Sequence, residues 1–189
     1  FKRCRSGGIV RIMADGILKV GQITNSAGSG NITIGSGVTV NVNRPSFKVY
    51  GSADQTGLVL NTYNTMALNT AVWDTASGFN TSTYKYVVPE AGKYYLSLQF
   101  SVETSAAIQI TCLANIYNET QGRQEVSFQH ISAVGHSSSA QPYIRTISGS
   151  SELAASDSLY CRVYVYAASG TLTIKNGLAS SNFSGYKIG

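Results

Sequence analysis

The sequence has few charged residues and no long apolar run. Charged side chains make up 12% of the 189 residues, about half the usual share of roughly 25%. A disordered chain combines low hydrophobicity with high net charge, whereas 43% of these residues are hydrophobic, so disorder throughout is excluded. A transmembrane helix needs a run of about 18 apolar residues, and none is present. We therefore expect a globular chain without membrane insertion.

Cysteine is scarce and its count, three, is odd. Cys4 lies near the beginning of the chain, whereas Cys112 and Cys161 each lie within an apolar alternation. Disulfide-stabilised secreted domains are usually shorter and have even counts, so we expect buried free thiols and folding in a reducing cytoplasm. A Cys112–Cys161 bridge is the alternative. No apolar signal-peptide segment follows the first cations, and Phe1 in place of Met predicts a processed chain or a fragment.

Basic residues are concentrated in the first eleven positions. The net charge is +5, and four of the 14 lysines and arginines lie there: Lys2, Arg3, Arg5 and Arg11. The rest of the chain is nearly neutral and has no basic stripe, so we expect no nucleic-acid partner. A basic tail can contact phosphate, but a solvated terminus is the simpler interpretation of residues 1–8.

Patterns typical of catalytic or zinc sites are also missing. The two histidines, His130 and His136, would lie about 20 Å apart along one strand, and no Cys-x-x-Cys or His-x-x-x-His spacing is present. Glycosidases need two opposed carboxylates, and the only close pair is Glu119 and Glu125. We therefore expect no enzymatic activity and no cofactor.

Calcium is the one metal for which candidate ligands exist. It takes about six to eight oxygen ligands, and Asp54, Asp74 and Asp157 could supply some of them. Asp74 is expected to cap a turn instead, because Asp side chains accept hydrogen bonds from nearby backbone. Calcium therefore stays an alternative to the absence of any cofactor.

Apolar residues alternate with polar ones over many short segments, and no segment keeps a helical period. In residues 93–102 every second side chain from Tyr94 to Val102 is apolar, and Leu159 to Val165 repeat the pattern. Pro89 to Gly92 predict a hairpin corner before the stronger of these strands. Eight to ten strands with short connections are typical of an all-β sandwich or jelly roll. We expect this head over residues 46–189.

A Gly- and Ser-rich strip precedes the head. Within residues 9–45 the alternating apolar positions include Ile32, Ile34, Val38 and Val40, a pattern that predicts short strands joined by tight turns. Such a strip has too little apolar surface to fold alone. We therefore expect three copies to close into a β-prism-like shaft without free edges.

Three tyrosines and an arginine form a polar stripe opposite the apolar face of residues 159–165. They are Tyr160, Arg162, Tyr164 and Tyr166. Tyr and Arg are enriched at the centres of protein interfaces. We predict that these four residues lie at a trimer interface together with the four apolar shaft positions; the alternative is that they are ordinary outward-facing strand residues.

A series of short motifs follows in order through residues 46–188: Leu68-Asn69, Asp74, Gly78-Phe79-Asn80, Tyr84, Tyr86, Pro89, Gly92, Tyr94-Tyr95, the segments 148–153 and 157–163, and Phe183-Ser184-Gly185-Tyr186. These motifs resemble those of the globular heads of the C1q/tumour-necrosis-factor (TNF) family. The sequence departs from the family pattern at Leu68, where Phe is commoner, at Ser156, where Gly is usual, and in a Ser-rich insertion at 135–141.

The resemblance implies a ten-stranded jelly roll, a compact trimer and a ligand-binding rather than catalytic role. It also implies that the strands carrying the last aromatic alternation pack near the three-fold axis, in agreement with the stripe at Tyr160. The N-terminal strip is similar to repeats that precede such heads in bacteriophage structural proteins, notably tail fibres. Vertebrate heads of the family follow a Gly-X-Y collagen stalk instead, and no such period is present in this sequence.

These features predict a trimeric phage tail fibre or spike on the virion surface, folded in the host cytoplasm, that attaches to a host glycan or outer-membrane protein. The N-terminal segment would contact other virion proteins. Candidate ligand contacts are Trp73, Phe79 and Tyr84, or Tyr117; for Trp73 the alternative is packing in the core. The alternative functions are a structural virion component, such as a capsid fibre, decoration or tail protein, and a secreted C1q-like ligand-binding head.

Overall fold

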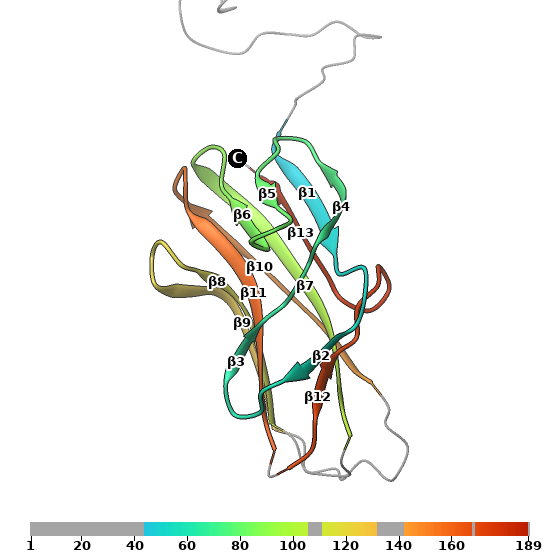
Figure 1. Ribbon diagram of the computed structural model, residues 1–189. Helices are drawn as coiled ribbons and strands as arrows, with labels where there is room; N and C mark the ends of the chain where they lie inside the picture. The colour runs from blue at the N-terminus through green and yellow to red at the C-terminus, as the bar shows by residue number, and fades with distance from the viewer. Residues whose placement is uncertain (1–43, 106–110, 132–141, 168, 189) are drawn as a thin grey trace, which may run out of the picture. The chain divides into compact units, whose positions relative to one another are not determined.

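The computed structural model describes residues 44–105, 111–131, 142–167 and 169–188. Within these residues the chain forms thirteen strands and no helix. The strands make two antiparallel sheets that pack face to face (Figure 1). This confirms the predicted all-β jelly roll, whereas the predicted shaft over 9–45 lies outside the described residues. No helix long and apolar enough to cross a membrane occurs in the described part of the chain.

The first sheet has seven strands and is built around the long strand β7 (Gly92–Thr104). One edge of β7 pairs with β10 (Tyr143–Leu153), and the other pairs first with β13 (Asn182–Lys187) and then with β12 (Leu172–Ile174). Beyond β13 lie β1 (Ser46–Tyr50) and the edge strand β4 (Thr70–Asp74), and beyond β12 lies β2 (Gln55–Leu58).

The second sheet has six strands and is built around β11 (Ser158–Tyr166). On one side β11 pairs with β8 (Thr111–Asn118), which in turn pairs with β9 (Arg123–Ile131). On its other side it pairs with β6 (Lys85–Val87) at one end and with β3 (Tyr63–Thr65) further along. The two-residue strand β5 (Phe79–Asn80) pairs with β6.

The core lies between the sheets and is filled by the apolar faces that the alternation predicted. All five apolar residues of β7 from Tyr94 to Val102, and the four of β11 from Leu159 to Val165, are at most 1% exposed. Ser101 is the exception on the polar face of β7, since it is fully buried. Its N–H donates to Ser181 Oγ and its carbonyl accepts from the Lys175 N–H, because the segment after β12 folds over it.

The connection at Pro89–Gly92 is not a hairpin, and that prediction was wrong. Strand β6 belongs to the six-stranded sheet and β7 to the seven-stranded sheet. Val88 still bonds with the chain just before β11, since its N–H donates to the Asp157 carbonyl and its carbonyl accepts from Ser156. The chain therefore leaves one sheet only at Pro89 and crosses to the other.

The strand count differs from the prediction for a simple reason. Ten strands were expected, whereas thirteen are present among the described residues. Very short strands such as β3 and β5, of three and two residues, account for the excess. They lack an alternation of their own and pair only because a longer strand lies beside them.

The two cysteines of the head are free and buried, as expected. In the ladder between β8 and β11, Cys112 lies opposite Val165 and Cys161 lies opposite Ile116. The two residues are thus four positions apart along the ladder, which corresponds to about 13 Å. Disulfide geometry requires Cα atoms within about 7 Å, so a Cys112–Cys161 bridge does not form in this fold.

Candidate functional site

The outer face of the six-stranded sheet carries a row of tyrosines around one arginine. Strand β11 lies between β8 and β3, and its residues Tyr160 and Tyr164 lie opposite Tyr117 of β8 and Tyr63 of β3. Arg162 occupies the position between the two on β11. We call these five residues the tyrosine–arginine row: Tyr160, Tyr117, Arg162, Tyr63 and Tyr164.

Neighbouring side chains of the row are in direct contact. The Arg162 guanidinium carbon lies 3.7 Å from the Tyr117 ring centroid and 4.1 Å from the Tyr63 ring centroid. The Tyr117 and Tyr160 rings meet edge to face at 5.6 Å, and Tyr63 and Tyr164 do so at 5.3 Å. Each such contact contributes of order 1 kcal/mol, so the row is a rigid feature of the sheet surface.

Besides the two tyrosine rings, a side chain of the neighbouring strand β8 holds Arg162. Its Nε donates a 2.8 Å hydrogen bond to Asn115 Oδ1. Asn115 lies opposite Arg162 in the β8–β11 ladder and is 1% exposed. A buried amide oxygen needs a donor, and the guanidinium supplies it. One hydrogen bond and two aromatic contacts therefore hold the side chain of Arg162.

At one end of the row lies a salt bridge. Lys85 Nζ is 2.6 Å from Glu119 Oε2 and 5.8 Å from the centroid of the Tyr160 ring. Both partners of this pair are partly exposed. The positive charge of Lys85 is thus compensated locally, whereas no acidic residue among those described pairs with Arg162.

The outer face of the seven-stranded sheet is different, because small polar residues and tyrosines form it. Ser97 of β7 lies opposite Ser148 of β10 and Ser184 of β13. One step along the strands Tyr95 lies between Ser150 and Tyr186, with the two tyrosine rings 5.4 Å apart. We call this surface the serine–tyrosine face; its residues are Tyr95, Ser97, Ser148, Ser150, Ser184 and Tyr186. Tyr186 is 51% exposed.

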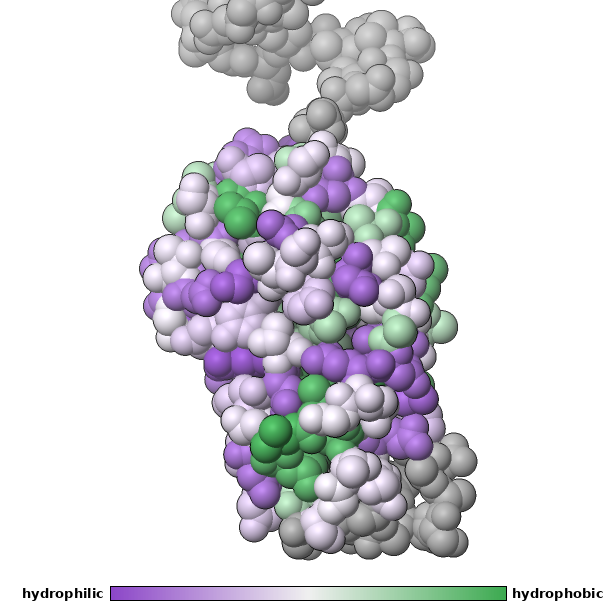
Figure 2. Space-filling model, viewed as in Figure 1, coloured by the Kyte–Doolittle hydropathy of each residue, from purple (hydrophilic) through white to green (hydrophobic). Residues whose placement is uncertain are grey.

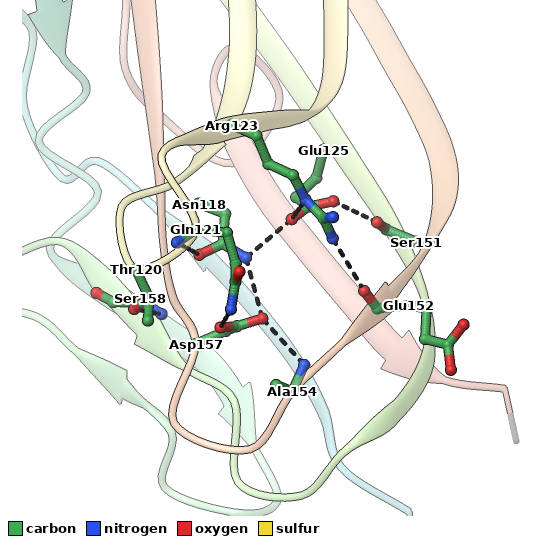
Figure 3. A network of polar contacts seen from close by, with 10 residues as sticks. All are labelled: Asn118, Thr120, Gln121, Arg123, Glu125, Ser151, Glu152, Ala154, Asp157 and Ser158. Atoms are coloured by element: carbon green, nitrogen blue, oxygen red, sulfur yellow. Dashed lines mark hydrogen bonds and ion pairs between the residues drawn. The ribbon is translucent and has the colours of Figure 1, made fainter.

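A network of polar groups ties the β8–β9 turn to strands β10 and β11 (Figure 3). The buried Asn118 Nδ2 donates to Glu125 Oε1 at 2.8 Å and to Asp157 Oδ2 at 3.0 Å. Asp157 also accepts from Gln121 Nε2 and from the Ala154 N–H. Burial alone raises the pKa of Asp157, but these hydrogen bonds and the nearby Arg123 outweigh it, so the pKa lies below its usual value. This network is structural, because the Asp157 carboxylate is already occupied.

The other candidate calcium ligands are also engaged within the chain. Asp74 accepts from the Phe79 N–H at 2.7 Å and from the Ala76 N–H at 3.4 Å, so it caps the turn before β5 as expected. Asp54 binds Lys175 Nζ and the Asn176 N–H. The described residues contain no group of three or more His, Cys, Asp or Glu side chains that could hold a metal ion.

Two solved structures are similar to this chain. The globular domain of the zebrafish complement 1qA protein is 14% identical, with a TM-score of 0.53, over 77% of this chain and 98% of that chain. The TNF protein Eiger from S. frugiperda is 15% identical, with a TM-score of 0.52, over 77% of this chain and 92% of that chain. No protein-family model matches the sequence, and no curated protein does. The head is a C1q/TNF-like jelly roll.

Two glycines of the resemblance lie at close approaches within this jelly roll. A Cβ on Gly78 would lie 2.7 Å from the Val87 carbonyl oxygen and from the Tyr86 ring. A Cβ on Gly185 would lie 2.9 Å from Leu96 and from the Phe47 ring. Side chains are excluded at both positions, which gives a physical reason for glycine in these two motifs.

The predicted ligand contacts do not form one site in the C1q/TNF-like head. Trp73 is 46% exposed on edge strand β4, with Lys48 Nζ 6.0 Å from its ring centroid. Phe79 is half-buried and stacks on Phe47 at 6.4 Å, so its ring belongs to the packing of the head. Tyr84 is half-buried in the turn before β6, and Tyr117 belongs to the tyrosine–arginine row.

Of the predicted interface residues, Tyr160, Arg162 and Tyr164 lie together in the row and Tyr166 is 57% exposed at the end of β11. The shaft positions Ile32, Ile34, Val38 and Val40 lie outside the described residues. Sequence reasoning missed Tyr63 and Asn115. Asn115 left one signal, a polar residue in the middle of an apolar strand.

Proposed function

We propose that the chain is a homotrimeric virion fibre, a phage tail fibre or spike, whose C1q/TNF-like head attaches to the surface of the host cell. The observation that carries the proposal is the jelly roll itself, which has the fold of C1q and TNF heads. The strip over residues 9–45, with its similarity to bacteriophage fibre repeats, supplies the shaft and the contact with other virion proteins. The protein folds in the bacterial cytoplasm and acts on the virion.

The serine–tyrosine face is suited to pack against further copies of the chain. Serine side chains allow close approach of a second sheet, and Tyr95 and Tyr186 offer apolar ring surface with polar tips. Lys93 and Glu152 lie at one end of this face, and Lys48 lies at its side, opposite Ser184. Interface centres are depleted in charge and enriched in Tyr, which supports this face as the trimer interface.

The sequence predicted a different interface, the stripe at Tyr160, Arg162, Tyr164 and Tyr166. Tyr160, Arg162 and Tyr164 already contact one another through Tyr117 and Tyr63, and Tyr166 is the most exposed of the three tyrosines. The stripe therefore remains the alternative trimer surface. One pair of substitutions distinguishes it from the serine–tyrosine face.

Analytical ultracentrifugation of the full chain at micromolar concentration tests the trimer and its surface. Tyr186→Glu and Tyr166→Glu place the same charge at rings that are 51% and 57% exposed on the two faces. We expect the unmodified chain and Tyr166→Glu to sediment as trimers and Tyr186→Glu as a monomer, because a buried unpaired charge is costly. The reverse result supports the stripe, and a monomeric unmodified chain refutes the proposal.

Host attachment is tested on the particle. Three linked heads on each fibre raise avidity by on the order of 10²–10⁴ over one weak site, so removal of residues 46–189 should abolish most adsorption of particles to host cells. This particle keeps the strip but lacks the head, and its adsorption is compared with that of the unmodified particle. Unchanged adsorption would contradict receptor binding and favour the purely structural role in the virion.

A further inference from the structure

Arg162 has no acidic partner among the described residues. Lys48, Lys93 and Arg145 have none either, but only Arg162 lies between two tyrosine rings and also donates to a buried side-chain amide. Four other cations each form an ion pair: Lys85 with Glu119, Arg123 with Glu125, Lys175 with Asp54 and Glu103, and Lys187 with Glu90. Among the described residues Arg162 instead makes one side-chain hydrogen bond, from Nε to the neutral amide of Asn115. A full positive charge thus stays uncompensated at the centre of an ordered sheet.

The orientation of Arg162 leaves one edge of its guanidinium available. Nε is directed to the buried Asn115, and Tyr117 and Tyr63 cover its two sides at 3.7 Å and 4.1 Å. A guanidinium has five N–H donors, four of them on the two terminal nitrogens. Those four have no hydrogen-bond partner among the described residues. The free edge has the fork geometry that matches a planar carboxylate.

The rings around Arg162 supply a second kind of contact. The row crosses three adjacent strands over roughly 10 Å, and Tyr160 and Tyr164 lie on either side of the cation along β11. Tyrosine rings combine an apolar face with a hydroxyl, which suits the C–H faces and hydroxyl groups of sugar rings. Apart from the Lys85–Glu119 pair at one end, residues beside the row on the same face are uncharged, among them Thr65, Ser127 and Gln129.

We propose that the tyrosine–arginine row binds an acidic polysaccharide, with a sugar carboxylate on Arg162 and the neighbouring rings on the tyrosines. A single uncompensated cation matches one carboxylate per sugar, because Lys85 is already neutralised by Glu119 at 2.6 Å. An acidic peptide would offer the carboxylate without sugar rings for the tyrosines. This inference rests on the proposed function, since it names the ligand class of a head that attaches to a cell surface.

The test is binding of the full chain to immobilised polygalacturonate, alginate and polysialic acid, measured by biolayer interferometry. We expect binding to at least one of them and none to methyl-esterified polygalacturonate, which keeps the sugar rings and loses the charge. Arg162→Gln should weaken binding on the order of ten- to hundredfold, as expected when a charge-assisted pair is lost. Arg162→Lys should also weaken it, because lysine keeps the charge but has no planar fork.

Arg145→Gln is the matched control, since it removes the same charge from an arginine that also stacks on a tyrosine. The Arg145 guanidinium carbon lies 4.3 Å from the Tyr143 ring centroid, in the other sheet. We expect its binding to stay within twofold of the unmodified chain. Thermal unfolding followed by circular dichroism verifies that each variant is folded. If Arg162→Gln does not fold, the binding of Arg162→Lys is used for the test instead.

Three binding results and one assembly result would overturn the inference. The first binding result is binding by Arg162→Gln that equals that of the unmodified chain, and the second is no binding of the unmodified chain to any of the three carboxylated polysaccharides. The third is stronger binding to poly-glutamate than to these polysaccharides, which would identify an acidic protein partner. Loss of the trimer in Arg162→Lys would also overturn it, because the row would then be an interface between copies. If the chain is trimeric and mediates adsorption to host cells but does not bind carboxylated polysaccharides, this inference is refuted and the proposed function still holds.

Discussion

Gly185 lies where β13 passes closest to the core. An added Cβ would meet Leu96 and the Phe47 ring at 2.9 Å and the Tyr95 carbonyl oxygen at 3.1 Å. The backbone oxygen cannot move away without disturbing the β7–β13 ladder. We expect Gly185→Ala to lower the free energy of unfolding by about 1–3 kcal/mol, the usual cost of overpacking a core, measured by urea denaturation.

Gly149→Ala is the matched control for this prediction. Gly149 lies opposite Leu96 on β10, and its added Cβ would meet only a methyl group of Val126, at 3.3 Å. That side chain can shift by a few tenths of an ångström. We expect a change within about 0.5 kcal/mol; an equal loss in both variants would show that the crowding at Gly185 is not the cause.

Asp157 makes the stability of the head depend on pH in the acidic range. Its pKa is held below the usual value: burial raises it, but hydrogen bonds from Gln121, the Ala154 N–H and Asn118, with the charge of Arg123, more than offset that effect. A carboxyl with a lowered pKa contributes stability above its unfolded pKa, about 3.9, and loses it as the pH falls through the folded value. We therefore expect the unfolding free energy to fall below about pH 4.

The comparison for this pH dependence is Asp157→Asn. The amide would present an N–H₂ group to the N–H donors of Ala154 or Gln121, so we expect a loss of about 1–3 kcal/mol at neutral pH. Because asparagine does not titrate, the variant should lose less stability than the unmodified chain between pH 5 and pH 3. Parallel curves for the two chains, measured by urea denaturation at each pH, would assign the acid sensitivity to other carboxyls.

At the scale of elements, the turn between β4 and β5 depends on one side chain. The Asp74 carboxylate accepts hydrogen bonds from the N–H groups of Phe79 and Ala76. The turn thereby positions the Phe79 ring against Phe47. We expect Asp74→Ala to cost about 1 kcal/mol, typical of a lost backbone-capping bond, and Asp74→Asn to cost less because it keeps an acceptor oxygen. Thermal unfolding measures both, and equal effects would contradict the capping role.

Elements with a strict alternation could be predicted from the sequence, and others could not. Strands β7 and β11 are buried on one face, so their period of two appears directly in the sequence. The crossing at Pro89 looked like a hairpin because Pro and Gly indicate a turn without indicating which strands pair. That choice is made by the bonds of Val88 to the chain before β11, which lies nearly seventy residues later.

The candidate site was predictable in part for the same reason. Tyr160, Arg162 and Tyr164 share a face of one strand, so their spacing identifies them as a group. Their contacts with Tyr117 and Tyr63 depend on the register of β8 and β3 against β11, which no local pattern encodes. The unpaired state of Arg162 likewise depends on where every acidic residue ends up in the fold.

At the scale of the whole molecule, the two sheets expose surfaces of different chemistry. The serine–tyrosine face consists of serines and tyrosines, with Lys48, Lys93 and Glu152 at its margins, whereas the tyrosine–arginine row has a cation at its centre. Figure 2 also shows apolar side chains gathered over β2 and β3 in the lower half of the view, where Val59 is 63% exposed. A head that trimerises through one sheet and binds through the other keeps its ligand sites on the outside of the trimer.

The two buried thiols report whether the head unfolds as one unit. Cys112 and Cys161 are each 1% exposed, and burial raises the pKa of Cys112 to about 12 and that of Cys161 well above its usual value. The thiolate is the reactive form of cysteine, and burial disfavours it at both positions, so reaction with a thiol reagent at pH 8 requires opening of the fold. In a Cys4→Ser chain we expect neither thiol to react in buffer and both to react in urea.

Because the core is shared by both sheets, the urea midpoint for thiol reaction should coincide with the midpoint for loss of β-sheet circular dichroism. The variants Cys112→Ala and Cys161→Ala, each in the Cys4→Ser chain, follow one thiol at a time and should each show coinciding midpoints. Thiol reaction at lower urea than the loss of sheet signal would contradict this prediction. It would mean that the six-stranded sheet, which carries both cysteines and the tyrosine–arginine row, opens separately from the seven-stranded sheet.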